Sequence, residues 1–196
     1  MFDKKIVSNE FNIHESVKCV YSRFNGNKCV IICLYVDVML IFGTDSKSIK
    51  LTKSLLSSNF DMKDIGLADL ILGIKIIKNE HGLVLTQSHY IEKILKKFNY
   101  YDCKPMSIPF ASNIILYPNT SRAVSQLEYT CVIGCLMYVV TCTRLDITFV
   151  VEKLSRYTIN PSQAHWQAVY KILKYLKHTI DYDIYYTRYP IDILQF

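Results

Sequence analysis

The stretch LYVDVMLI, Leu34–Ile41, places one acidic residue inside an otherwise apolar segment. The run Lys28–Val36 is apolar without alternation, which is typical of a buried strand, and Met39–Gly43 resumes the same character. An acid between two such runs predicts the tip of a tight hairpin, where Asp37 is held rigidly and faces outward. A carboxylate there suits Mg²⁺, which prefers hard oxygen ligands. An exposed aspartate in a turn is more often only a turn former, so these residues alone leave both interpretations open.

A second hairpin precedes this one, and a helix follows it. The segment Lys18–Phe24 is rich in Val, Tyr and Phe, and Asn25-Gly26 behind it is a turn signal because both residues tolerate positive φ. After the Asp37 hairpin, Thr44-Asp45-Ser46 supplies a helix N-cap, which predicts a helix over Ser46–Asn59. We therefore expect two antiparallel hairpins followed by a helix.

The rest of the chain changes from strands to helices. A further strand pair is expected at Leu70–Lys78 and Gly82–Thr86, turned at Glu80-His81-Gly82. Helical periodicity then predicts helices over Ser88–Asn99, Gln126–Thr141, Asp146–Tyr157 and Ser162–Thr179, with a closing strand over Tyr182–Thr187. The fold class is α+β first and mainly helical afterwards, with a division near residue 87.

The composition is that of a folded intracellular chain. Of 196 residues, 51% are hydrophobic and 20% are charged, which excludes a disordered tail. The net charge of +6 permits an anionic partner without requiring one. The longest apolar runs, Cys29–Val36 and Cys131–Val140, are shorter than the roughly 20 residues of a membrane span. The charged N-terminus is no secretory signal, so we expect a cytoplasmic or otherwise intracellular protein with no membrane partner.

The cysteines favour a packing role over metal binding. Seven cysteines cannot all pair within the chain. The pairs Cys29/Cys33 and Cys131/Cys135 are each four residues apart, which is not the usual spacing of a zinc knuckle, and each pair lies in an apolar stretch. We interpret them as small core residues in a reducing compartment.

A series of short motifs runs along nearly the whole chain in a fixed order. Those of the first half are Phe2-Asp3, Asn9-Glu10-Phe11, Lys18-Cys19-Val20-Tyr21, Leu34-Tyr35-Val36-Asp37, Phe60–Gly66, Leu72-Gly73-Ile74 and Leu85-Thr86-Gln87. Those of the second half include Asp102–Pro105, Tyr129, Leu136-Met137-Tyr138, Thr143-Arg144, Asp146-Ile147, Leu154–Tyr157, His165-Trp166 and Tyr175-Leu176-Lys177. In this order and spacing, the chain resembles the reverse transcriptase of copia-type LTR retrotransposons.

The resemblance implies a partial polymerase palm at residues 1–87 and a mainly helical thumb at residues 88–196. The parent enzymes are RNA-directed DNA polymerases that extend a primer on an RNA or DNA template with two Mg²⁺ ions. In the resemblance, Asp37 matches the first aspartate of the family's YxDD hairpin, a catalytic metal ligand, and Tyr35 would lie near the primer-template duplex. The segment Leu72-Gly73-Ile74 matches the turn that grips the primer end.

Three departures from the family bear on activity. Position 38 is Val where the family has the second aspartate, and a valine side chain cannot ligate a metal. The family's other essential aspartate belongs to a palm strand upstream of this chain, and the fingers are missing with it. The chain also ends at Phe196, about where the family's RNase H domain would begin. With one of three carboxylates present, we expect weak or no Mg²⁺ binding and no polymerase activity.

Nucleic-acid contact without catalysis is the alternative function. Lys171, Lys174 and His178 recur at i, i+3 and i+7 opposite an apolar stripe, and could follow a phosphate backbone. The same pattern suits an ordinary solvated helix face, and both interpretations also apply to Lys93, Lys96 and Lys97. Two further hypotheses therefore stay open: a non-catalytic nucleic-acid-binding or interaction module, and a translated relic without function.

Overall fold

The chain folds as two compact units, Met1–Ala68 and Asp69–Phe196, in a computed structural model that describes all residues except 1, 81, 110–115, 121–123 and 188–196. Each unit contains one four-stranded antiparallel sheet together with helices, which confirms the α+β class. The units divide ahead of the third strand pair, whereas the sequence suggested a division behind it, near residue 87. The reason is pairing, because this strand pair forms one sheet with the strand that follows the last helix.

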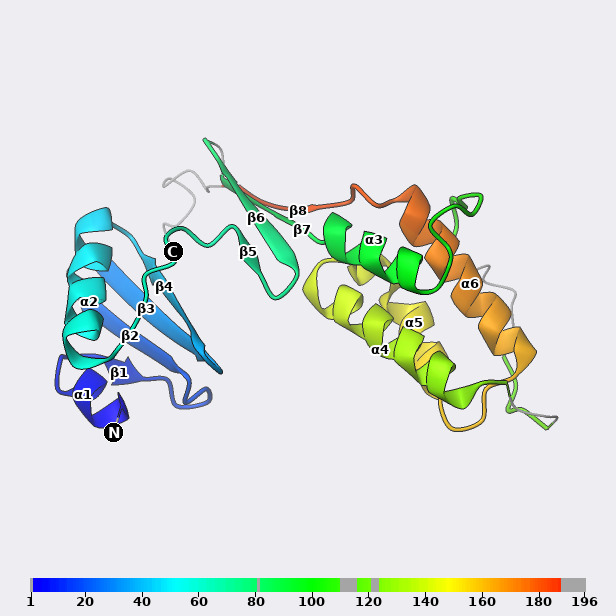
Figure 1. Cartoon of the computed structure of the whole chain (residues 1–196), viewed down its shortest axis with the longest axis horizontal. Helices are drawn as coiled ribbons and strands as arrows, with labels where there is room; N and C mark the ends of the chain where they lie inside the picture. Colours follow the sequence, from blue (N-terminus) through cyan, green and yellow to red (C-terminus); the bar gives the residue numbers. More distant parts are fainter. Residues whose placement is uncertain (1, 81, 110–115, 121–123, 188–196) are drawn as a thin grey trace, which may run out of the picture. The chain divides into compact units, whose positions relative to one another are not determined.

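The first unit is a sheet with helices on one face (Figure 1). Its strands follow the order β1-β2-β3-β4 and are β1 (Asn12–Ile13), β2 (Val20–Asn25), β3 (Lys28–Tyr35) and β4 (Val38–Gly43). The helices are α1 (Phe2–Val7) and α2 (Ser46–Asn59). The Asp45 side chain caps α2 by accepting the Ser48 N–H at 2.9 Å, as the sequence predicts. The core of this unit consists of Ile6, Phe11, Tyr21, Val30, Ile32 and Leu56.

Two expectations for these strands need correction. Asn25 pairs with Lys28, so the first hairpin loop is Gly26-Asn27, one residue later than expected. Its first position alone has positive φ (56°), which is the feature of a type II′ turn. The expectation of a strand buried on both sides is also wrong. Only the face of β3 that carries Val30 and Ile32 is buried, because α1 and α2 cover a single face of the sheet.

The second unit combines a sheet with a group of packed helices (Figure 1). The sheet order is β5-β6-β7-β8, with β5 (Leu70–Ile71), β6 (Ile74–Asn79), β7 (Gly82–Thr86) and β8 (Ile184–Thr187). The helices are α3 (Ser88–Lys97), α4 (Gln126–Cys142), the 3₁₀ turn η1 (Leu145–Ile147), α5 (Thr148–Ser155) and α6 (Gln163–His178). Their shared core includes Ile91, Leu95, Leu136, Val151 and Leu173.

These elements match the predicted ones with two differences. The predicted strand Leu70–Lys78 is interrupted by a turn at Leu72-Gly73, which separates β5 from β6. The helix predicted from Asp146 begins instead as the η1 turn and continues as α5. In the β6–β7 hairpin Asn79 pairs with Gly82, while His81 of the expected turn lies outside the described residues. None of the helices in the described part of the chain has the length and hydropathy to cross a membrane.

An ion pair with a buried arginine links the end of α6 to η1. The Arg144 side chain is 1% exposed and donates to both carboxylate oxygens of Asp146, at 3.0 Å and 2.7 Å. It also donates to the Thr179 carbonyl at 2.9 Å, and Tyr175 Oη donates to Asp146 at 2.7 Å. Burial raises the pKa of Asp146, but the hydrogen bonds from Arg144 and Tyr175 outweigh it and hold this pKa below its usual value.

Candidate functional site

The hairpin that carries Asp37 has the geometry that the sequence predicts. Tyr35 pairs with Val38, so Val36 and Asp37 form a two-residue loop at the tip, and Asp37 is exposed. Val36 is 93% exposed with φ of 53°, an uncommon conformation for a β-branched residue. The strand register puts Tyr35 and Val38 side by side on the face of the sheet that α1 and α2 leave uncovered. Asp37 therefore extends from the tip of a two-residue hairpin loop, beside an apolar surface.

The carboxylate at this tip has no grouped partners for a metal ion. Val38 follows it with an apolar side chain, and Val36 precedes it. Across the residues that the structure describes, no three His, Cys, Asp or Glu side chains group so as to hold a metal ion. Asp37 thus provides one carboxylate group as a metal ligand.

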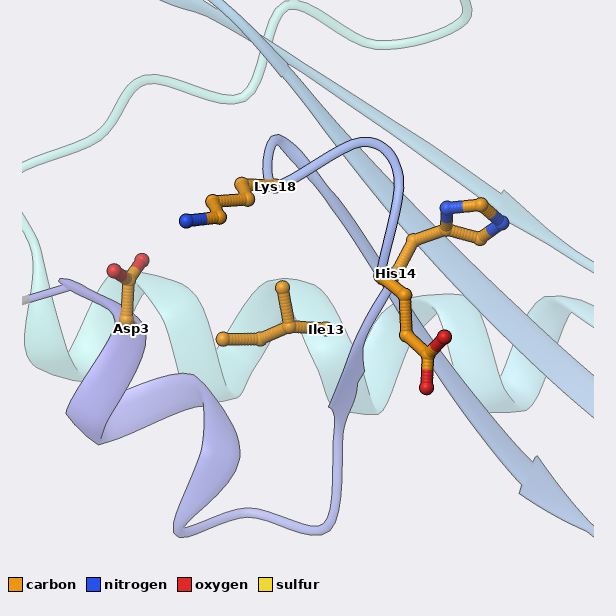
Figure 2. Close-up of a pocket in the computed structure, with 5 residues that line it drawn as sticks. Asp3, Ile13, His14 and Lys18 are labelled. Carbon is orange, nitrogen blue, oxygen red and sulfur yellow. The ribbon is translucent and has the colours of Figure 1, made fainter.

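A charged hollow lies in the same unit, lined by Asp3, Ile13, His14, Glu15 and Lys18 (Figure 2). Figure 2 shows the side chains of Lys18 and Asp3 directed toward one another, whereas His14 points away from them. Charges of both signs therefore line this hollow, which selects neither anions nor cations.

Asp3 is also engaged in the packing of the first unit. Tyr21 Oη donates to the Asp3 carboxylate at 2.5 Å. Burial, reinforced by this carboxylate, raises the pKa of Tyr21 to about 12. Asp3 therefore acts as a structural acceptor for a buried phenol rather than as a free ligand.

The second predicted contact, Leu72-Gly73-Ile74, forms the turn between β5 and β6. Ile71 pairs with Ile74, and both loop residues have positive φ, 51° at Leu72 and 78° at Gly73, the feature of a type I′ turn. Tyr138 Oη, from α4, donates a hydrogen bond to the Leu72 carbonyl oxygen. The turn is thus fastened to the helices of its own unit, a contact that the sequence did not reveal.

The predicted phosphate contacts share one stripe of α6. Lys171 and Lys174 are half-buried there, and His178 is exposed. The structure adds a neighbouring cluster that the sequence analysis missed. Lys177 donates to the Cys103 carbonyl at 2.8 Å and its ammonium lies 5.9 Å from the centre of the Tyr101 ring. The Lys96 ammonium of α3 lies 4.7 Å from the same ring.

No local signal identifies this cluster, because distant segments of the chain assemble it. Tyr101 belongs to the connection after α3, whereas Lys177 lies on the last turn of α6. Two ammonium groups near one aromatic ring offer a cationic surface. Such a surface can attract phosphate groups.

Comparisons with known proteins place this geometry in a family. Residues 1–112 match the family described as "Reverse transcriptase (RNA-dependent DNA polymerase)". The chain is 41% identical over 188 residues to the retrovirus-related Pol polyprotein from transposon TNT 1-94 of Nicotiana tabacum, covering 91% of this chain and 14% of the polyprotein. It is 34% identical over 162 residues to the Pol polyprotein from transposon RE1 of Arabidopsis thaliana, covering 82% of this chain and 11% of that protein.

A shorter relative is an uncharacterized mitochondrial protein of Arabidopsis thaliana, 33% identical over 154 residues, or 79% of this chain and 64% of that protein. The chain therefore spans less than two thirds of each of these relatives. No solved structure matches it. The matched region contains both the Asp37 hairpin and the Leu72-Gly73 turn. The resemblance expected from the motifs is confirmed, and the chain belongs to the reverse transcriptase family, in the group found in copia-type retrotransposon Pol polyproteins.

Proposed function

We propose that this chain binds a primer-template duplex but does not polymerise on it. The observation that carries the proposal is the Asp37 hairpin, which keeps the tip geometry while Val38 stands where a second carboxylate would be needed. Transfer of a nucleotidyl group by two metal ions requires carboxylates that hold both ions about 4 Å apart. One carboxylate at an exposed tip does not meet that requirement.

Magnesium is the cofactor expected of the parent family, and the described residues do not fit it. Mg²⁺ gives up its water reluctantly and needs near-ideal octahedral geometry, so a lone carboxylate binds it weakly. Asp37 has an apolar neighbour on each side, and the described part of the chain groups no three ligands of the required kind. We therefore assign no catalytic step to a metal ion in this chain.

Duplex binding is supported by features of the second unit. The Leu72-Gly73 turn is the proposed contact to the primer end. Lys171, Lys174 and His178 on α6 form the proposed contact to the phosphate backbone, and the Lys96–Lys177 cluster around Tyr101 adds positive charge. Each ammonium that neutralises a phosphate releases counterions, which makes the affinity dependent on salt.

The test combines a primer-extension assay with a salt titration of binding. With Mg²⁺ and deoxynucleoside triphosphates, the purified full chain should give no template-dependent product above background. A labelled primer-template oligonucleotide should bind with an affinity that falls as salt rises. The double variant Lys171→Gln/Lys174→Gln should bind more weakly and reduce the slope of log K against log[salt] by about 2.

A matched control is Lys47→Gln/Lys50→Gln, which removes two exposed lysines from α2 of the first unit. This variant should keep the slope of the unmodified chain. Template-dependent extension by the unmodified chain would overturn the proposed inactivity. Equal slopes for the two double variants would overturn the assignment of α6 to the phosphate backbone.

A further inference from the structure

The geometry points to Tyr138 and Tyr90 as positioning residues, which hold the Leu72-Gly73 turn in the arrangement that contacts the duplex. This inference rests on the proposed duplex binding. Tyr138 lies on α4 and Tyr90 on α3, so two helices reach the same turn from within the second unit. Neither side chain is proposed to touch nucleic acid, and their effect passes through the turn.

The turn needs support because its own hairpin is short and its backbone is strained. β5 contributes only two ladder pairs, Leu70 with Lys75 and Ile71 with Ile74. A hairpin of this length has little stability by itself. Leu72 also has φ of 51°, and a residue with a Cβ atom pays a steric cost in this left-handed region. Such a conformation persists only where surrounding structure imposes it.

Tyr138 supplies the polar part of that support. Its hydroxyl donates to the carbonyl oxygen of Leu72, the first residue of the strained loop. A type I′ loop directs this carbonyl away from the ladder, so the bond fixes a group that the two strands do not hold. The bond spans 66 residues of sequence and ties the loop to helix α4.

Tyr90 supplies the steric part. A Cβ atom placed on Gly73 would lie 3.4 Å from Cδ2 of the Tyr90 ring, so the ring packs against the loop. The rings of Tyr90 and Tyr138 meet edge to face, with centroids 5.1 Å apart. Burial, together with the adjacent Cys135, raises the pKa of Tyr90. The two tyrosines therefore contact one another as well as the turn.

The experiment uses Tyr138→Phe in the full chain, since this change removes the hydroxyl and keeps the ring against Tyr90. Three quantities are measured: amide hydrogen exchange of residues 70–76, affinity for a labelled primer-template oligonucleotide, and the thermal unfolding midpoint. Exchange in this segment should rise and affinity should fall, each about two- to tenfold, the effect of one lost hydrogen bond. Exchange in α3 and α4 and the unfolding midpoint should stay near those of the unmodified chain.

The matched control is Tyr185→Phe, which removes a hydroxyl from an exposed tyrosine on β8 of the same sheet. It should change neither exchange nor affinity. A second variant, Gly73→Ala, places a methyl group in contact with Tyr90 and strains a residue with φ of 78°, so it should also raise exchange in residues 70–76.

The outcomes separate this inference from the proposed function. Unchanged exchange in Tyr138→Phe, or a rise spread over the whole unit, would overturn the positioning role. Raised exchange with unchanged affinity would also overturn it, because the turn would then move without consequence for the duplex. If the unmodified chain binds no duplex while exchange rises only in residues 70–76, duplex binding fails but Tyr138 still holds the turn.

Discussion

The two units of this protein each contain a four-stranded antiparallel sheet, but they bury different kinds of side chain. In the first unit the described core is almost wholly apolar, and Thr52 is its one buried polar residue. In the second unit the described core also encloses Thr86, Gln87, Thr143, Arg144, His165 and Thr179. Most of these are bound to one another or to nearby backbone, as Arg144 is to Thr179 and Thr143 to Gln87.

Both units leave apolar side chains of their sheets exposed, as Ile77 and Leu83 are in the second. The outer face of the first sheet presents Phe24, Tyr35, Val38 and Phe42, which are 42% to 67% exposed, and β4 is an edge strand. An apolar face and an unpaired edge are features that soluble domains usually cover. The buried side chains show that specific polar contacts hold the helical core of the second unit. The stability of the first unit depends on a small apolar core on one face of its sheet.

The largest effect is expected from Arg144→Ala in the second unit. The change empties the space of a side chain that is 1% exposed and leaves the buried Thr179 carbonyl without its donor, which together cost about 3 to 5 kcal/mol. The Asp146 carboxylate also loses its donor, but it is partly exposed to solvent and adds little to this cost. Chemical unfolding followed by tryptophan fluorescence measures it, because Trp166, the one tryptophan of the chain, lies on α6. Arg156→Ala, at an exposed arginine, is the control. Equal midpoints for the two variants would contradict a stabilising role for Arg144.

The first unit should respond most to a loss of apolar volume. Leu56→Ala empties part of its small core and should destabilise this unit by about 2 to 4 kcal/mol, within the range for buried leucines. The measurement is amide exchange in β3, with Trp166 fluorescence expected to stay unchanged if the two units unfold independently. Leu51→Ala, an exposed leucine on the same helix, should have little effect. A fluorescence midpoint that moves with Leu56→Ala would show that the units unfold together.

Part of this contrast could be predicted from the sequence. The Asp37 tip follows from an acid between two apolar runs, and the helix Ser46–Asn59 follows from its N-cap at Asp45, because both signals are local. The Leu72-Gly73 turn had no such local signal and was expected only from the family resemblance. A leucine with positive φ is not a turn residue by type, and its support comes from Tyr138, far along the chain.

The polar contacts of the second core are hidden from sequence for the same reason. Arg144 and Thr179 meet only when α6 has packed against the helices before it. Lys177, Tyr101 and Lys96 likewise come together through tertiary structure. Whether one or both faces of the first sheet are buried depends on which helices pack against it. The apolar sequence of β3 does not contain that information.

Acid should weaken the second unit through His165. Burial lowers the pKa of this histidine, and the Tyr117 carbonyl only partly opposes that effect. Its Nδ1 accepts the Ser162 backbone N–H at 2.9 Å, so the folded state requires a neutral ring. Because the folded pKa lies below the unfolded value of 6.5, stability is fully present above about pH 6.5 and is lost as pH falls below it.

Trp166 fluorescence unfolding between pH 7.5 and 5 measures this loss. His165→Gln should flatten the dependence, because glutamine can accept the same capping bond without titrating. His178→Gln, at an exposed histidine on the same helix, should keep the slope of the unmodified chain. A slope that survives His165→Gln would assign the acid sensitivity to other groups.

The smallest effect should be a gain in the first unit from Val36→Gly. Val36 has φ of 53° and is 93% exposed, so its side chain adds steric strain and almost no packing. Relief of a left-handed conformation is worth about 1 to 2 kcal/mol, and the added freedom of glycine in the unfolded chain offsets about 0.4 to 1 kcal/mol of it. The net gain of roughly 0.5 to 1 kcal/mol should appear as slower amide exchange in β3 and β4. Val17→Gly, at an exposed valine without positive φ, should instead lose stability. If both variants lose stability, neighbouring contacts already compensate for the strain at Val36. The loop at Asp37 would then be held by the surrounding structure, as the Leu72-Gly73 turn is held by Tyr138.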